Sequence, residues 1–206
     1  MRSVQVAIDK RVDAYVFTGD LCDPDNGAGT IRAISLAVSM AMALARMSIP
    51  SYWLAGNHDV VEDGSGLTTL APLRALHSDY VHVLDKPGVH YLSSHQCLLA
   101  LPFTASSHGY DVVEFVLDAM EKHPAWDMII LSHLALPGIM PGSETNDMPR
   151  GREVRLPLDL AKRAKLTLNG HYHRRQVYEG VQVVGSLARL SFAEESHEPG
   201  FLVVTL

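Results

Sequence analysis

Short apolar runs alternate with longer stretches of helix-forming residues along the chain. A run of β-forming residues at 15–18 is followed by a segment of good helix formers at 28–47, which Pro50 closes, and then by a second short run at 52–55. Strand, helix and strand in this order predict a βαβ unit, whose two strands are parallel. Ahead of this unit, residues 3–14 have the pattern of a helix.

The same alternation continues through the rest of the chain. Further strands are predicted at 81–84, 89–92, 97–101, 127–131, 166–168, 176–179, 181–185 and 201–206, and further helices at 111–122 and 158–164. Residues 137–152 are rich in proline, glycine and polar side chains and predict a long loop. The pattern indicates an α/β fold, and a length of 206 residues fits a single domain spanning 1–206.

Composition and charge narrow the function classes. Hydrophobic residues make up 47% and charged residues 19%, which is typical of a folded globular chain. The net charge of −6 gives no basic surface of the kind that accompanies sequence-independent DNA binding. Cys22 and Cys97 stand in no metal or redox spacing, which favours a reducing compartment. No signal sequence and no apolar run long enough to span a membrane is recognised, so a cytoplasmic location is expected.

Polar side chains follow four of the predicted strands at their carboxyl ends. They are Asp20, Asn57 with His58, His133, and His171 with His173. Because the carboxyl ends of neighbouring strands meet at one edge of a sheet, we expect these side chains to lie side by side. Each has a structural explanation by itself, as a hydrogen-bonded histidine or a turn residue. Together they favour a site for a divalent metal, since carboxylate, amide and imidazole groups are metal ligands.

The motifs carry a resemblance to a known family. Gly19-Asp20, the Gly-Asn-His-Asp sequence at 56–59, the isolated His133 and the Gly-His-Tyr-His sequence at 170–173 follow one another in the order found in calcineurin-like metallophosphoesterases. The segment at 185–195 resembles the one after the last metal motif in SbcD-type DNA repair exonuclease subunits. The resemblance covers almost the whole chain. It implies an α/β sandwich of two mixed sheets flanked by helices.

The resemblance also implies a two-metal site. In the family, the aspartate matched by Asp20 bridges two divalent ions. One ion is completed by the residues that match Asn57, His133 and His171, and the other takes the one that matches His173. Manganese is the first expectation, and iron, cobalt or zinc fit the same mixture of oxygen and imidazole donors.

The resemblance assigns catalytic roles to two further residues. His58 would contact the phosphate or protonate the leaving oxygen, a task that suits an imidazole near neutral pH. Asp59 would orient His58. Because Arg174 and Arg189 follow or flank the last motif in the sequence, they are candidate phosphate contacts, and a solvated surface is the alternative explanation for both.

One motif of the family has no match in the sequence. The family's first motif, Asp-x-His, should precede Asp20, but Asp9 and Asp13 have no histidine two residues later. Three explanations are open: the sequence starts downstream of the true start, the protein is naturally short and binds one metal weakly, or a partner supplies the missing strand. We therefore expect a sheet without its first strand, one nearly complete metal site and a second that is weak or absent.

The leading hypothesis is a metal-dependent phosphodiesterase, a DNA nuclease of SbcD type that uses metal-activated water. The sequence holds no capping domain and no basic surface, so a DNA substrate is expected to require a partner such as an ATPase subunit. One alternative is a catalytically weak or inactive homologue that serves as a binding or assembly subunit. Another is a phosphodiesterase of small molecules. No membrane partner is expected, an oligomer is compatible with the sequence, and exonuclease or endonuclease action is left open.

Overall fold

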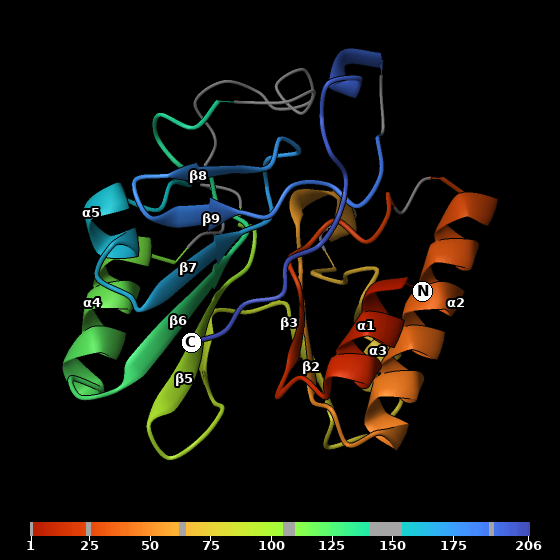
Figure 1. The fold of residues 1–206 in the computed structure, drawn as a ribbon, viewed down its shortest axis with the longest axis horizontal. Helices are drawn as coiled ribbons and strands as arrows, with labels where there is room; N and C mark the ends of the chain where they lie inside the picture. The colour runs from red at the N-terminus through yellow and green to blue at the C-terminus, as the bar shows by residue number, and fades with distance from the viewer. Residues whose placement is uncertain (1, 24–25, 62–64, 105–109, 141–153, 190–191) are drawn as a thin grey trace. The chain divides into compact units, whose positions relative to one another are not determined.

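The computed structural model describes residues 2–23, 26–61, 65–104, 110–140, 154–189 and 192–206. The chain forms two compact units, Met1–Asp85 and Lys86–Leu206, and each is built around its own β-sheet. In each unit helices cover a face of the sheet (Figure 1). The predicted α/β fold with two sheets flanked by helices is confirmed. The assignment of 1–206 to a single domain stays a prediction.

The sheet of the first unit is wholly parallel. It has the order β1-β2-β3, with Val16 opposite Tyr52 and Tyr52 opposite His82. The elements of this unit are α1 (Arg2–Lys10), β1 (Tyr15–Phe17), α2 (Ala28–Arg46), β2 (Ser51–Leu54), η1 (Asn57–Asp59), α3 (Ala71–Arg74) and β3 (Val81–Leu84). β1, α2 and β2 form the predicted βαβ unit. The sheet is parallel and not mixed, because a helical segment in each connection returns the chain to the same end of the sheet.

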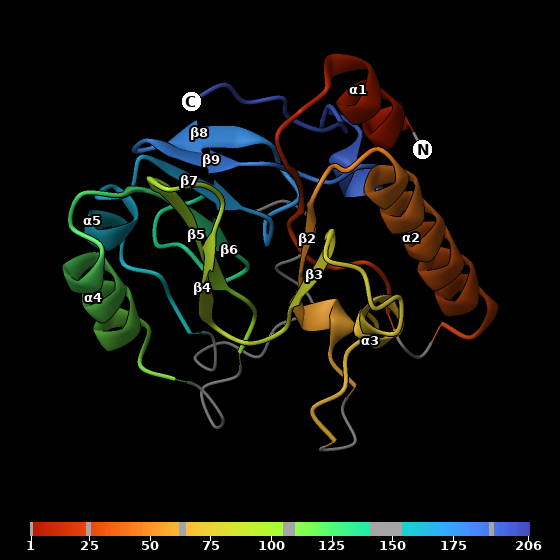
Figure 2. The same cartoon turned by 90° about the horizontal axis from the view of Figure 1, so that it is seen from below.

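The core of the first unit lies between its sheet and the helices α1 and α2, which share one side of the sheet (Figure 2). α2 buries Ala37, Ala41 and Leu44, residues spaced by three or four positions and therefore on one helix face. They belong to one core cluster with Trp53 of β2, which is fully buried. The indole N–H of Trp53 donates to the hydroxyl of Ser51 over 3.0 Å, so its polar atom is also satisfied.

Helix α2 corrects one expectation from the sequence. We expected no apolar run long enough to cross a membrane, but α2 meets the length and composition of a spanning helix, with a mean hydropathy of 1.6 over an 18-residue window. Its many alanine and methionine residues produce this value. Core helices of globular folds pass the same test, and α2 packs on the sheet of the first unit as the helix of a βαβ unit does.

The sheet of the second unit is mixed and has the order β4-β5-β6-β7-β9-β8. Its elements are β4 (Gly88–Tyr91), β5 (Gln96–Leu101), α4 (Val112–Lys122), β6 (Asp127–Ser132), α5 (Leu158–Ala161), β7 (Leu166–Asn169), β8 (Gln176–Tyr178), β9 (Val181–Val183) and η3 (Phe192–Glu194). β5, β6, β7 and β9 are parallel, whereas the outer strands β4 and β8 are antiparallel to their neighbours. Apart from η3, which the sequence did not predict, these elements match the predicted ones within a few residues.

Helices α4 and α5 cover one face of this second sheet (Figure 1). α4 begins after Asp111, whose carboxylate accepts a hydrogen bond from the amide of Glu114 at 3.0 Å and caps the helix. Val112 and Val116 of α4 are buried in one core cluster with Leu99 of β5 and Ile130 of β6. The central strands are consequently held rigidly up to their carboxyl ends, where the candidate residues follow.

Two predictions for the second unit need comment. The strand predicted at 201–206 is wrong, since these residues form no strand and Val203, Val204 and Leu206 are about half exposed. Residues 201–206 are rich in β-forming side chains, but they have no neighbouring strand to pair with among the described residues. β-forming side chains alone do not produce a hydrogen-bonded ladder. Most of the loop predicted at 137–152 lies outside the described residues.

Candidate functional site

The first group of candidate residues follows β1 and β2, which are adjacent parallel strands. Gly19 has φ of 104° and Asp20 has φ of 60°, both in the left-handed region. Gly19 needs the conformational freedom of glycine there, and Asp is among the residues that tolerate this region. A Cβ atom on Gly56 would lie only 2.1 Å from the Asp20 carboxylate oxygen Oδ1. Both glycines therefore serve the placement of the Asp20 side chain.

The carboxylate of Asp59 ties these two strand ends together. Its Oδ2 accepts hydrogen bonds from the amides of Asp20 at 2.8 Å and Gly56 at 2.9 Å. Its Oδ1 accepts from the amide of Leu21 at 2.9 Å and the hydroxyl of Thr69 at 2.5 Å. Asp59 is fully buried, and several donors of this kind compensate a buried carboxylate for its lost hydration. Asp59 therefore fixes the backbone at Asp20.

Asn57 and His58 lie in the short helix η1 and are half-buried. The backbone amide of His58 donates to Asp20 Oδ1 over 3.0 Å. This bond and the contacts of Asp59 bring Asp20 together with the Gly-Asn-His-Asp motif, as the sequence predicted for these two strand ends. That Asp59 orients the imidazole of His58 stays a prediction, in addition to its observed role as a cross-link.

Cys22 lies beside this group and is half-buried. Burial raises the pKa of its thiol, the hydrogen bond with Thr69 lowers it, and the negative charges of Asp59 and Asp23 raise it further. Together these effects hold the pKa of the Cys22 thiol above its ordinary value.

The second group follows β6 and β7, which are also adjacent and parallel. His133 is fully buried and His171 is only 4% exposed. Their rings meet edge to face with centroids 5.2 Å apart and planes at 70°. The structure therefore brings together the histidines of two strand ends that are 38 residues apart in the sequence, as their position after adjacent strands predicts.

Asn169, the last residue of β7, fixes the relation between these two strand ends. Its side-chain Nδ2 donates to the carbonyl of Leu134 at 2.9 Å, and its Oδ1 accepts from the amide of His171 at 3.2 Å. The amide of Gly170 also donates to the carbonyl of Ser132 at 3.0 Å. The chain just after His133 and the chain entering His171 are thus hydrogen-bonded to the same buried amide. The sequence interpretation gave Asn169 no role.

His173 has a buried acidic partner that the sequence interpretation missed. Its Nδ1 lies 2.7 Å from Oε1 of Glu194, which is fully buried at the end of η3. Glu194 was noted in the sequence only as part of the segment that resembles SbcD-type proteins. Between the two histidines, the hydroxyl of Tyr172 accepts from the amide of Leu136 and donates to its carbonyl, each at 3.0 Å. Tyr172 thereby anchors the motif to the core of the second unit.

The two arginines proposed as phosphate contacts lie on the surface of the second unit. Arg174 donates to the sulfur of Met140, and Nε of Arg189 donates to the carbonyl of His197 at 2.9 Å. Both side chains are exposed. Their binding to phosphate stays a prediction.

One expectation about the site is wrong. The four donor-bearing strand ends were expected along the edge of one sheet, but β1 and β2 belong to the first sheet and β6 and β7 to the second. The reason lies in the chain after β3, which starts a new sheet through the antiparallel pair β4 and β5. Each sheet accordingly carries its own pair of donor-bearing strand ends.

The donors of each unit fit a divalent metal in chemical type. The first unit offers the carboxylate of Asp20 and the amide of Asn57, and the second offers the buried imidazoles of His133 and His171 and the half-buried imidazole of His173. Within the described residues, no three His, Cys, Asp or Glu side chains are grouped so that they could hold an ion. The structure thus supplies two suitable donors in the first unit and three in the second.

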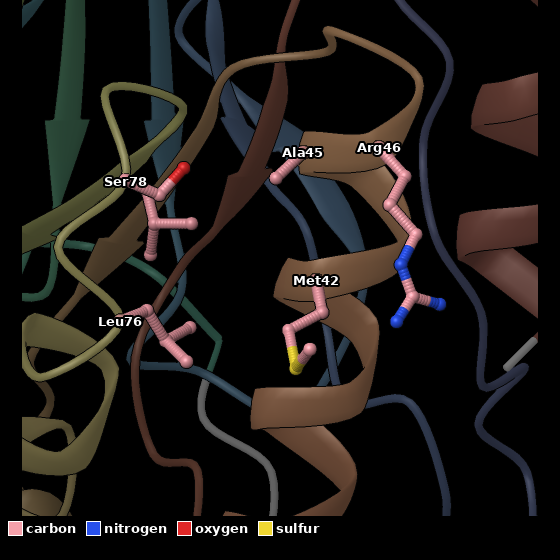
Figure 3. A pocket seen from close by; sticks show the side chains of 6 residues that line it. Met42, Ala45, Arg46, Leu76 and Ser78 are labelled. Atoms are coloured by element: carbon pink, nitrogen blue, oxygen red, sulfur yellow. The ribbon is translucent and has the colours of Figure 1, made fainter.

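A surface hollow in the first unit is separate from these residues. It has a volume of about 330 Å³ and lies between α2 and the chain leading into β3 (Figure 3). Its walls are formed by Met42, Ala45, Arg46, Leu76, Ser78 and Val81. None of the candidate metal or catalytic residues lines it, so it has no part in the chemistry considered below.

Comparisons with known proteins agree with the motifs and the fold. The family model described as calcineurin-like phosphoesterase matches residues 2–175. No curated protein matches the chain. Among 25 matching chains of solved structures, one crystal structure has a TM-score of 0.54 and 12% sequence identity, over 89% of this chain and 83% of its own. An identity this low supports the fold alone.

Proposed function

The chain belongs to the calcineurin-like phosphoesterase family, and we propose that it is a metal-dependent phosphodiesterase, specifically a DNA nuclease of SbcD type. Membership supports metal-dependent phosphoester hydrolysis in general, since the family typically binds two divalent metals. The narrower assignment is supported by the resemblance of residues 185–195 to SbcD-type proteins.

The observation that carries the proposal is the pairing of donor-bearing strand ends. In each unit two adjacent parallel strands end in ligand-type residues, and buried hydrogen bonds of Asp59 or Asn169 hold those ends together. Fixed donors at strand ends are typical of sites that position a ligand precisely enough for catalysis. The hydrogen bonds of Asp59 and Asn169 reach beyond the last paired residues of the strand ladders, to the strand ends that carry the ligand-type residues.

The proposed metal ligands are Asp20, Asn57, His133, His171 and His173. When bound, divalent metals supply an activated water and neutralise charge on the phosphoryl oxygens. Asp20 is held in a left-handed conformation beside Gly56, which fixes where its carboxylate points. Mn²⁺ is the proposed ion. A second ion is expected to bind more weakly, because the sequence matches fewer of its ligands.

His58 is the proposed proton donor to the leaving oxygen. Its backbone amide is bonded to the carboxylate of Asp20, so the backbone of His58 is held beside that proposed ligand. Because His58 is only half-buried, its imidazole keeps access to substrate. Asp59 is proposed to support His58 through the backbone that both share.

The net charge of −6 affects which phosphodiester substrates the chain can bind by itself. An acidic protein gains little from phosphate contacts on long DNA, so we propose that a partner such as an ATPase subunit holds the DNA. The same charge favours a second candidate function, hydrolysis of a small phosphodiester. A third, a weakly active assembly subunit, is favoured by the lack of a three-donor group among the described residues.

The direct test is hydrolysis of bis-p-nitrophenyl phosphate by the purified chain with Mn²⁺. We expect turnover that EDTA abolishes, and a loss of about 10²–10⁴-fold in kcat for His58→Ala, the usual contribution of a general acid. His95→Ala is the matched control, because His95 is exposed and lies outside both groups. Turnover that is absent from wild type, or equal in wild type and His58→Ala, would refute the proposed role. Linear DNA assayed alongside distinguishes a nuclease from a small-molecule phosphodiesterase.

A further inference from the structure

Glu194 is a buried carboxylate close to exposed residues. It is fully buried, whereas Phe192 in the same turn of η3 is fully exposed and Glu195 is exposed. One contact of this buried carboxylate is with the imidazole of His173, whose Nδ1 lies 2.7 Å from Oε1 of Glu194.

Burying a carboxylate costs several kcal/mol unless charged or hydrogen-bonding groups compensate it. The imidazole of His173, whose side chain is 15% exposed, is one such group. The 2.7 Å contact therefore points to a role of the carboxylate at that imidazole.

The segment that carries Glu194 is anchored at His173 from the backbone as well. The amide of Ser186 donates to the carbonyl of His173 at 3.1 Å, and the amide of Gly200 donates to the carbonyl of Ser186 at 3.1 Å. The segment is thus joined to His173 at Ser186, and its far end at Gly200 is joined back to Ser186. Inside the segment, the amide of His197 donates to the carbonyl of Glu194 at 2.9 Å and holds the turn.

A carboxylate accepts hydrogen bonds and cannot donate them when ionised. An ionised Glu194 can make its contact with Nδ1 only if Nδ1 carries the proton, and a neutral ring then carries its lone pair on Nε2. We propose that Glu194 is a positioning residue that fixes His173 as the Nδ1–H tautomer and presents Nε2 as the metal-binding atom. The proposal rests on the proposed function in that it takes His173 as a ligand.

The test measures the tautomer and the metal affinity separately in the full chain. Nitrogen chemical shifts of His173, recorded without metal at a pH where the ring is neutral, report which nitrogen carries the proton. We expect protonated Nδ1 in wild type, and a shift toward protonated Nε2 in Glu194→Ala, since a neutral imidazole in water prefers that form. Glu195→Ala is the matched control and should keep the wild-type spectrum.

Mn²⁺ affinity is measured in the same proteins from the EPR signal of free Mn²⁺. We expect Glu194→Ala to bind about 10–100-fold more weakly, the usual effect of removing a carboxylate behind a histidine ligand. Glu194→Gln, which keeps the shape of the side chain, serves if the alanine variant fails to fold, and should bind with intermediate affinity.

The two measurements separate the possible failures. Protonated Nε2 in wild type, or an unchanged tautomer in Glu194→Ala, overturns the role of Glu194 whatever the metal does. The expected tautomer shift together with unchanged Mn²⁺ affinity in both Glu194→Ala and His173→Ala instead overturns His173 as a ligand, and with it that part of the proposed function.

Discussion

The amide of Asp20 donates to the buried carboxylate of Asp59 over 2.8 Å, and this bond joins two motifs that are 39 residues apart in the sequence. Asp59 accepts three further hydrogen bonds, from two amides and from the hydroxyl of Thr69. All four acceptor positions of a carboxylate are then used. The last residue of the Gly-Asn-His-Asp motif thus holds the backbone of Asp20 as well as its own turn.

Asp59→Asn should destabilise the first unit by about 2–3 kcal/mol. An amide keeps one acceptor oxygen but places an NH₂ group against two of the four donors, which leaves them unsatisfied in the interior. Urea unfolding followed by Trp53 fluorescence in a Trp126→Phe background measures the change. Asp9→Asn is the control, because Asp9 is exposed and its side chain accepts a hydrogen bond from Gln5 in the same helix. Equal stabilities of the two variants would contradict this account of Asp59.

Gly56→Ala should displace Asp20. The backbone of Gly56 is extended, with φ of −97° and ψ of −176°, so alanine can adopt it and the cost is steric. The new methyl group would overlap the Asp20 carboxylate, and overpacking of this kind costs about 1–3 kcal/mol. Lower stability together with weaker Mn²⁺ binding is expected, measured by urea unfolding and EPR titration.

Gly200→Ala is the matched control for the Gly56→Ala experiment. Its added methyl group would lie 3.9 Å from the side chain of Arg175, which is an ordinary van der Waals distance. If Gly56→Ala binds Mn²⁺ as the control does, the close approach of Gly56 to Asp20 has no role in metal binding.

Asn169→Asp should weaken the second group. The aspartate lacks the NH₂ group that donates to the carbonyl of Leu134, and it places an oxygen against that carbonyl instead. We expect a loss of about 1–3 kcal/mol in stability, the cost of a buried polar group left unpaired, and weaker Mn²⁺ binding through His171. Asn26→Asp, at an exposed residue, is the control. A thermal melt of the variant that coincides with that of the control would argue against Asn169 as the link between β6 and β7.

His82 should make stability depend on pH. Its ring stacks on Tyr52 with centroids 4.6 Å apart, and burial lowers its pKa while the nearby Asp79 raises it by a smaller amount. The unfolded chain therefore takes up the proton first, so stability falls as pH drops below the ordinary histidine value of 6.5 and levels off below the folded pKa.

Melting temperatures at pH 7.5 and pH 5 test this for His82. The decrease between these two values should be smaller in His82→Gln than in wild type. Tyr52→Phe keeps the ring stack and should retain the wild-type decrease. A His82→Gln protein with the full wild-type decrease would show that other groups cause the pH dependence.

The sequence predicted much of the fold because its strands are strongly patterned. Leu98 to Leu101 and Met128 to Leu131 are continuous apolar runs, as expected for strands of a parallel sheet buried on both faces. It missed α3, whose four residues include Pro72 and are too few for a helical period. The sequence also predicted a strand at 201–206 that does not form, because a strand needs a neighbouring strand to pair with and composition does not reveal whether one is present.

The sequence predicted the candidate ligands of the site, but it did not predict the residues that hydrogen-bond to them and hold them in place. Asp20, His133 and His171 stand directly after apolar strands, so their location follows from local pattern. Asn169 and Glu194 act through contacts with residues distant in sequence, and an amide or carboxylate that is buried looks like a surface residue in a linear chain. The division of the four strand ends between two sheets was likewise set by long-range pairing.

The central claim, that the strand-end residues bind a divalent metal, is tested most directly by metal content. The purified chain is loaded with Mn²⁺, dialysed against metal-free buffer and analysed by mass spectrometry for Mn²⁺ per chain, beside Asp20→Ala, His171→Ala and the control His95→Ala. The account predicts bound Mn²⁺ in wild type and control and a clear loss in the other two variants. Equal Mn²⁺ content in all four proteins would contradict it.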